Sequence, residues 1–173
     1  AMREGQKLFS LVKDKKQLPH FLGVADACRD SKSLIQKGNE RVLKARLEDA
    51  KFFWEQDLKV PLKERARVLN RLIFQEKLGS YEDKAQRLKK ISSYLADKIE
   101  VKKDKDAVLQ AAELCKVDLL TEMVREFPSL QGKMGGLYAR QEGCPVQVWK
   151  GIYEHYQPLS LDDGCPSTLA GAI

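Results

Sequence analysis

The sequence has few of the residues on which most enzymatic sites depend. Only two histidines occur among 173 residues, and neither is followed by an aspartate. The four cysteines are far apart and form no Cys-x-x-Cys pair: Cys28, Cys115, Cys144 and Cys165. Because zinc knuckles and thioredoxin-type redox sites need closely spaced cysteines, this spacing argues against both. We expect free thiols in a reducing compartment.

A long apolar run is also lacking. No stretch approaches the roughly 20 apolar residues that cross a bilayer, and the first residues are polar and charged, unlike a signal peptide. We therefore expect a cytoplasmic protein that makes no membrane contact.

The composition is that of a folded domain. Hydrophobic residues make up 43% of the chain and charged residues 32%, a balance that argues against disorder. Lysine and arginine exceed aspartate and glutamate by 31 to 25, which gives a net charge of +6. This excess favours an acidic partner such as nucleic acid, although a solubilising surface would also account for it.

Hydrophobic periodicity predicts a mainly helical protein. Two short apolar runs, at 7–12 and 20–24, predict a small N-terminal strand hairpin. Residues 1–30 are therefore assigned to the end of a preceding domain or linker, and residues 31–173 to a helical domain. Helices are expected at 31–58, 61–79, 81–99, 106–127 and 146–156, with the first turn of another at 167–170. Because of that last turn, we interpret the domain as truncated at its C-terminus.

Local signals sharpen these helix predictions. Asp30 or Ser31 would cap the first helix and Ser80 the third, while Gly79 suits a left-handed residue at the end of the second. The segment 106–127 is apolar on more than one side, so it is the expected buried central helix. In the three helices before it, the residues expected to form apolar stripes include Val42 and Leu47 in the first, Leu62, Leu69 and Ile73 in the second, and Ala85, Leu88, Ile91, Leu95 and Ile99 in the third.

Three acidic residues, Asp118, Glu122 and Glu126, invite an interpretation as carboxylates for general acid–base chemistry. The alternative is an ion-paired helix edge that involves Lys116 or Arg125. The alternative is favoured, since no nucleophile accompanies the acids and structural ion-pair networks are common.

Two other sets of residues give weaker evidence of a functional site. The glycine-rich segment 131–138, with Lys133, could cradle a phosphate, but it fits neither the P-loop nor the dinucleotide-binding pattern. Tight helix packing or a bend is the favoured role of its glycines. A Cys–His enzyme based on Cys144 or Cys115 has still less support.

The basic residues are better evidence for RNA binding. Lys63, Arg67 and Arg71 share one face of the predicted 61–79 helix at i,i+4 spacing, and such a row can follow phosphates. With Lys133 and Arg140 they form the set of candidate RNA-binding residues, which would position RNA without reading its sequence. Taken alone, the composition favours a solvated helix face.

Several separate segments, in order, carry a resemblance to a known family. They are 38–43, 45–53, 74–79, 116–128, 130–135, 138–140 and 154–158. The longest reads Lys-Val-Asp-Leu-Leu-Thr-Glu-Met-Val-Arg-Glu-Phe-Pro. Together they resemble the β subunit of the bacterial two-subunit glycyl-tRNA synthetase, from about His20 to the C-terminus. Ordered blocks of this kind are far more specific than a single short motif.

The resemblance implies a helical bundle of HD-like type, because the helical region of those β subunits is related to HD-type phosphohydrolases. Their metal site needs a histidine, an adjacent His-Asp pair and a further aspartate. This sequence has no His-Asp pair, and only Asp118 stands near the old metal position. We therefore expect no catalytic, cofactor-binding or metal-binding residue in the chain. An HD-type metal-dependent phosphohydrolase remains the alternative.

The resemblance also implies a function for the parent enzyme, a glycine–tRNA ligase that joins glycine to its tRNA with ATP and magnesium. In that family the α subunit activates glycine and the β subunit supplies tRNA binding. The expected partners are the glycyl-tRNA synthetase α subunit and tRNA-Gly, with no DNA. The chain itself would be non-catalytic and without a cofactor, and would position tRNA or join subunit modules. A purely structural brace without RNA contact is a further alternative.

Overall fold

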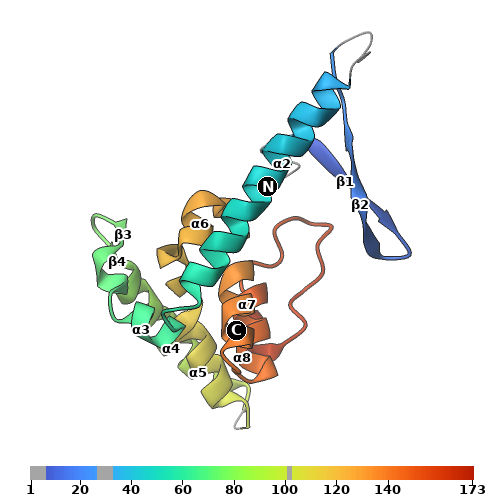
Figure 1. Cartoon of the computed structure of the whole chain (residues 1–173). Helices are drawn as coiled ribbons and strands as arrows, with labels where there is room; N and C mark the ends of the chain where they lie inside the picture. Colours follow the sequence, from blue (N-terminus) through green and yellow to red (C-terminus); the bar gives the residue numbers. More distant parts are fainter. Residues whose placement is uncertain (1–6, 27–32, 101–102) are drawn as a thin grey trace. The chain divides into compact units, whose positions relative to one another are not determined.

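The computed structural model describes residues 7–26, 33–100 and 103–173, which are mainly helical (Figure 1). The chain divides into two compact units, Ala1–Phe53 and Trp54–Ile173. The boundary falls within helix α2, Leu34–Asp57. The prediction of a mainly helical protein with a short strand hairpin is confirmed, whereas the HD-like type stays a prediction.

The first unit contains the predicted hairpin. Strands β1, Leu8–Lys13, and β2, Lys16–Gly23, pair antiparallel with Leu8 opposite Gly23. Asp14 and Lys15 between them both have positive φ, 52° and 61°. Two left-handed residues in a two-residue loop match the twist of a β-hairpin, which is why the chain reverses here.

Helix α2 ends at Asp57, close to the predicted end at 58. The caps predicted at Asp30 or Ser31 lie outside the described residues. The apolar stripe predicted for this helix is largely exposed at Val42 and Leu47. Among the described residues of the first unit, only the hairpin could cover it, and two strands are too few to build a core.

The second unit contains the other helices of the described residues, together with three short 3-10 turns, η1 to η3. Its elements are α3 (Leu62–Ala66), η1 (Leu69–Arg71), β3 (Ile73–Gln75), β4 (Gly79–Ser80), α4 (Tyr81–Lys98), α5 (Lys105–Leu114), η2 (Val117–Leu120), α6 (Glu122–Glu126), η3 (Pro128–Leu130), α7 (Lys133–Gln141), α8 (Val146–Glu154) and α9 (Leu169–Ala172). Helix α5 packs against α4, α8 and α9, and α7 packs against α8. Fully buried side chains such as Val108, Leu114 and Ile152 form the core.

The predicted 61–79 helix is wrong. Helix α3 has only five residues, and η1 and the β3–β4 hairpin follow it. Leu62 and Leu69 are buried as expected, but Ile73 is 72% exposed. The β-branched and aromatic residues at 73 and 74 favour a strand, and Gly79, with φ of 82°, closes the hairpin instead of ending a helix.

The single 106–127 helix is also wrong, although its burial is confirmed. The chain forms α5, then η2, then α6. The Thr121 hydroxyl donates to the Asp118 carbonyl at 2.6 Å and accepts from Val124 N, so it caps α6. Side-chain bonds to the backbone compete with a continuous helical ladder, and here they break it into three pieces.

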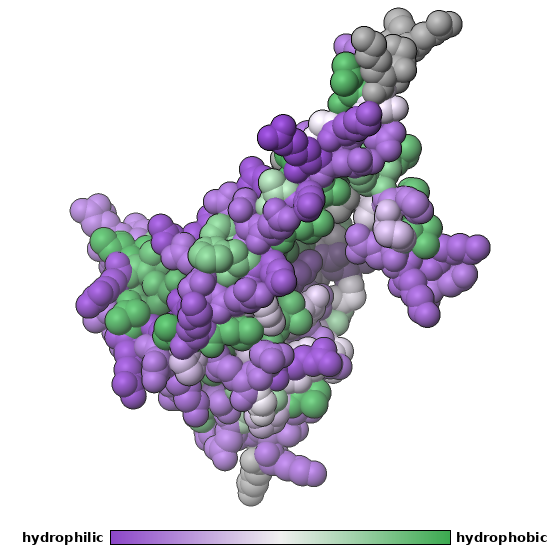
Figure 2. Space-filling view, viewed as in Figure 1, coloured by the Kyte–Doolittle hydropathy of each residue, from purple (hydrophilic) through white to green (hydrophobic). Residues whose placement is uncertain are grey.

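Helix α4 agrees with the prediction in its bounds and in its cap. The Ser80 side chain accepts from Asp83 N and the Asp83 carboxylate accepts from Ser80 N, a complete capping box. The predicted core stripe is wrong at Ile91, which is exposed, because α4 packs through small residues such as Ala96. Figure 2 shows hydrophobic surface near the β3–β4 end of this unit, where Leu78 is also exposed.

The predicted helices near the C-terminus are confirmed as α8 and α9. Glu154, at the end of α8, accepts hydrogen bonds from the backbone and hydroxyl groups of Ser167 and Thr168. Burial acts to raise the pKa of Glu154, but these hydrogen bonds outweigh it and lower the pKa. The carboxylate thus fastens α9 to α8.

No helix in the described ranges combines the length and apolar character that crossing a membrane would require.

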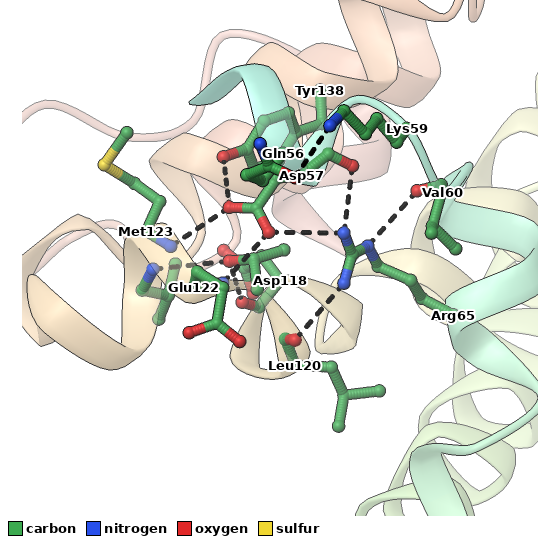
Figure 3. A network of polar contacts seen from close by, with 12 residues as sticks. Gln56, Asp57, Lys59, Val60, Arg65, Asp118, Leu120, Glu122, Met123 and Tyr138 are labelled. Atoms are coloured by element: carbon green, nitrogen blue, oxygen red, sulfur yellow. Dashed lines mark hydrogen bonds and ion pairs between the residues drawn. The ribbon is translucent and has the colours of Figure 1, made fainter. Parts of the chain in front are cut away.

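A buried carboxylate, Asp57, joins four elements of the second unit (Figure 3). Its Oδ1 accepts from Glu122 N at 3.0 Å and from Arg65 Nη2 at 3.2 Å. Its Oδ2 accepts from Met123 N at 3.0 Å and from the Tyr138 hydroxyl at 2.9 Å. The two amides open α6, where backbone donors have no helical partner. Asp57 therefore connects the end of α2 to α3, α6 and α7.

We expect Asp57→Ala to lower the free energy of unfolding by about 3–5 kcal/mol, because it leaves the Arg65 charge and the α6 amides without their acceptor. Urea unfolding followed by tryptophan fluorescence measures this directly, since Trp54 stacks on Tyr138 at 4.8 Å. The matched control is Glu122→Gln, which removes only the exposed ion pair with Arg125 and should cost less than about 1 kcal/mol. Equal effects of the two substitutions would contradict the role of Asp57.

Candidate functional site

The five candidate RNA-binding residues are all exposed: Lys63, Arg67, Arg71, Lys133 and Arg140. Lys63 lies in α3 and Arg67 directly follows it, so these two are one helical turn apart. The predicted helical row does not reach Arg71, because the chain leaves the helix at Val68 with φ of −111° and ψ of 11°. Arg71 ends η1 instead.

The structure places the other two candidates on α7. Lys133 begins that helix and Arg140 lies near its end, roughly 10 Å apart along the axis at 1.5 Å per residue. The Arg140 guanidinium lies over the Trp149 ring, 5.3 Å from its centroid, and Lys150 Nζ is 5.9 Å from the same ring. Helix α7 packs against α3, so Arg140 and Lys63 belong to neighbouring elements.

Arg65 does not belong to the exposed basic set, although it lies in the same stretch of sequence. Its guanidinium pairs with Asp57 and also donates to the carbonyls of Val60 and Leu120. It is a structural cation. Charge and helical spacing gave no sign of this, because one acceptor, the Leu120 carbonyl, is 55 residues away and the others lie in the segment 57–60 before α3.

Lys63 lines a hollow of about 300 Å³ together with Glu142 and Cys144. Glu142 Oε1 accepts from Leu62 N at 2.9 Å and thereby caps α3. Burial, and then the Glu142 charge, raises the pKa of the Cys144 thiol. Burial likewise raises the pKa of Cys115 to about 11. Both thiols are thus held in the less nucleophilic protonated form.

Of the remaining two cysteines, the structure describes one. Cys165 is an exposed free thiol, and Cys28 lies outside the described residues.

The three acidic residues Asp118, Glu122 and Glu126 do not converge on one site. Asp118 is 1% exposed, whereas Glu122 and Glu126 face solvent. Glu122 pairs with Arg125 at 2.9 Å, as the ion-paired interpretation predicts. Burial raises the pKa of Asp118 to about 6, against the lowering effect of its hydrogen bonds from Gly132 and Gly135.

The glycine-rich segment binds a carboxylate of its own chain. Asp118 Oδ2 accepts from Gly132 N at 2.5 Å and from Gly135 N at 3.1 Å. Gly132 has φ of 79°, and a Cβ on Gly135 would lie 3.0 Å from Ile152 Cγ2. The glycines thus allow a turn and a close approach of α7 to α8, which agrees with the favoured packing role.

A buried lysine–histidine pair was not predicted from the sequence. Lys116 is 5% exposed, and its Nζ lies 2.7 Å from His155 Nε2 and 3.8 Å from the centroid of the Tyr156 ring. His155 Nδ1 is 2.6 Å from the Ile152 carbonyl oxygen. Because a carbonyl only accepts, Nδ1 carries the proton and Nε2 accepts from Lys116. Burial and the Lys116 charge lower the pKa of His155 to about 4, so the imidazole is neutral.

Metal-binding geometry is not found in the part of the chain that the structure describes. In the described residues, no three histidine, cysteine, aspartate or glutamate side chains gather closely enough to hold a metal ion.

We expect the pKa shifts of Asp118 and His155 to oppose each other in the pH dependence of stability. The pKa of Asp118 is raised from 3.8 to about 6, so its stabilising contribution is present at low pH and is lost as pH rises through 6. The pKa of His155 is lowered from 6.5 to about 4, so its contribution is lost as pH falls below 6.5. Between pH 7 and 5 each changes the free energy of unfolding by about 1–2 kcal/mol, with opposite sign.

Single substitutions should separate the two opposing effects of pH on the free energy of unfolding. Asp118→Asn should make stability fall on acidification from pH 7 to 5, and His155→Gln should make it rise, when urea midpoints are measured along a pH series. The exposed Asp106→Asn serves as the control and should keep the wild-type profile. Parallel profiles for all four proteins would contradict the two shifts.

We expect Gly132→Ala to destabilise the protein more than Gly143→Ala. Both glycines have φ near 80°, so each alanine bears the same backbone cost, about 1–2 kcal/mol. A Cβ at Gly132 would also lie 2.7 Å from Tyr156 Cδ2, whereas nothing lies within 4 Å of one at Gly143. Crowding should add about 1–3 kcal/mol at Gly132. Urea unfolding of both variants tests this, and equal losses would contradict it.

Comparison with known proteins identifies the family. A family model described as glycyl-tRNA synthetase beta subunit matches residues 1–173. The glycine–tRNA ligase beta subunit of Geotalea daltonii is 44% identical over 174 residues, covering 100% of this chain and 25% of the relative. That of Halothermothrix orenii is 43% identical over 175 residues, covering 100% and 26%. That of Chromohalobacter salexigens is 44% identical over 173 residues, covering 99% and 25%.

The chain thus spans about a quarter of the length of these relatives. The match of the family model along the whole chain confirms the resemblance that the ordered sequence segments indicated. The chain belongs to the glycyl-tRNA synthetase beta subunit family.

Proposed function

We propose that this chain acts as part of the β subunit of a two-subunit glycine–tRNA ligase. The observation that carries the proposal is the family match along residues 1–173. The complete enzyme would attach glycine to tRNA-Gly with ATP and magnesium, in the cytoplasm and together with an α subunit. Because the chain spans a quarter of its relatives, this activity is assigned to the complete enzyme.

Within that enzyme we assign the chain a non-catalytic role. Its buried acids and its buried imidazole are engaged in bonds that hold the fold: Asp57 with the α6 amides, Asp118 with Gly132 and Gly135, and His155 with Lys116. The glycine-rich segment does not suit ATP, because two of its amides already donate to Asp118. We therefore assign the ATP and magnesium sites to other parts of the enzyme.

The exposed basic residues support a direct contact with tRNA. None of Lys63, Arg67, Arg71, Lys133 and Arg140 forms an ion pair with another residue that the structure describes, in contrast to Arg65 and Arg125. Their charges are thus available to phosphates, and a phosphate contact releases counterions. Such contacts would fix the position of the tRNA without reading its sequence.

We expect the triple variant Lys63→Gln, Arg67→Gln, Arg71→Gln to bind tRNA-Gly at least about tenfold more weakly than the wild-type chain. The slope of log affinity against log salt should fall by roughly 2–3, in line with three lost phosphate contacts. Binding of fluorescently labelled tRNA-Gly, and of an unrelated tRNA, across a salt series from about 50 to 200 mM measures both.

The matched control removes three exposed lysines that form no ion pair within the described ranges: Lys77→Gln, Lys90→Gln, Lys98→Gln. It changes net charge equally, so an equal loss of affinity would mean that charge alone, and not this surface, governs binding. If the wild-type chain binds neither tRNA at the lowest salt, the chain is a structural brace and the proposed RNA contact is wrong.

A further inference from the structure

A cavity of about 310 Å³ lies in the second unit, among helices α4, α5, α8 and α9. Its polar lining includes Lys84, Ser92 and Lys116, and its apolar lining includes Leu88, Val108 and Ala112. The volume is at the lower end of the range for small-molecule sites, about 300–1,000 Å³. The five exposed candidate RNA-binding residues do not line it.

Two lysines bring positive charge to this cavity, and its lining contains no aspartate or glutamate, although Ile173, the last residue of the chain, also lies on it. Lys116 Nζ lies beside the neutral His155 imidazole and the Tyr156 ring, and Lys84 Nζ lies 3.7 Å from the centroid of the Phe74 ring. Neither lysine forms an ion pair within the described part of the chain. An ammonium group removed from water is costly unless it is paired.

Asp118 forms no ion pair with either lysine. Asp118 acts on Lys116 through its charge, but its Oδ2 is occupied by the amides of Gly132 and Gly135. Burial, and also the positive charge of Lys84, lowers the pKa of Lys116. The two ammonium groups therefore repel each other. An anion bound in the cavity would offset this repulsion and stabilise both lysines in their charged form.

A third donor lines the same cavity. Ser92 is 6% exposed, and its hydroxyl forms no hydrogen bond with any other residue that the structure describes. Its oxygen is not among the fully buried unpaired atoms of the described residues, so the hydroxyl is open to the cavity and can donate to a ligand there. Two ammonium groups and a hydroxyl are donors that suit the several acceptor oxygens of a phosphate.

We propose that this cavity binds the phosphate group of a small phosphate monoester, with Lys84, Lys116 and Ser92 as the donors. His155 is a positioning residue, because its Nε2 holds Lys116 Nζ without adding charge. The wall formed by Leu88, Val108 and Ala112 receives the organic part of the ester. The phosphate can come from a free nucleotide or from the phosphorylated end of an RNA, since both present the same group.

The test is a titration of the isotope-labelled 173-residue chain, followed by NMR, with adenosine 5′-monophosphate, inorganic phosphate and adenosine at constant ionic strength. Adenosine 5′-monophosphate should produce saturable shifts at the amides of Lys84, Ser92 and Lys116, and adenosine should not. Lys84→Gln should weaken binding about tenfold and Ser92→Ala about threefold. Lys90→Gln, on the same helix but outside the cavity, should change it less than about twofold.

A 5′-phosphorylated trinucleotide separates the two sources of phosphate. If it binds as adenosine 5′-monophosphate does, the site accepts an RNA end, and if it fails while the mononucleotide binds, the site takes free nucleotides. The absence of saturable shifts with both phosphate compounds, equal binding of adenosine, or an unchanged affinity in Lys84→Gln would overturn the proposal. Lys90→Gln and Lys84→Gln both keep the buried Lys116, so a folding defect is not expected to confuse the comparison.

The outcome is independent of the tRNA experiment. Loss of phosphate binding in Lys84→Gln leaves the exposed residues Lys63, Arg67 and Arg71 intact, and the triple variant at those positions leaves the cavity intact.

Discussion

The Asp57 carboxylate accepts hydrogen bonds from partners as many as 81 residues away in the chain. Its acceptors satisfy the first amides of α6, the charge of Arg65 and the hydroxyl of Tyr138 at once. A buried charge is tolerated only when its partners are all in place. The end of α2 and the helices α3, α6 and α7 are therefore coupled through this one carboxylate.

Local signals in the sequence were sufficient for some elements and failed for others. The N-terminal hairpin and the Ser80-capped helix α4 depend on turns and caps within a few residues, so both could be predicted. The breaks that divide 106–127 depend on Thr121 and on Asp118, whose partners Gly132 and Gly135 come later in the chain. Hydrophobic periodicity alone does not detect such bonds. In α4 it correctly predicted that Ala85 is buried, but it wrongly predicted burial of Ile91, because the helix packs through small residues such as Ala96.

The same distinction applies to the functional surfaces. Charge and spacing were enough to select Lys63 and Arg67, which are indeed exposed. They gave no means to separate these residues from Arg65, which pairs with the buried Asp57 and also donates to the distant Leu120 carbonyl. Lys116 and His155 are 39 residues apart, and the sequence around each residue contains no motif that predicts their contact. The cavity that Lys116 lines is formed by four helices, so no single segment could have indicated it.

The Asp118 carboxylate occupies the amides at the start of α7 as an intramolecular anion. Its effective concentration at those amides is set by the chain and not by the surrounding solution. A free anion would have to displace this carboxylate, which belongs to the same chain and is therefore present at a much higher effective concentration. The fold thus keeps one anion-accepting feature permanently filled, while the donors of Lys84, Lys116 and Ser92 stay open to anions from solution.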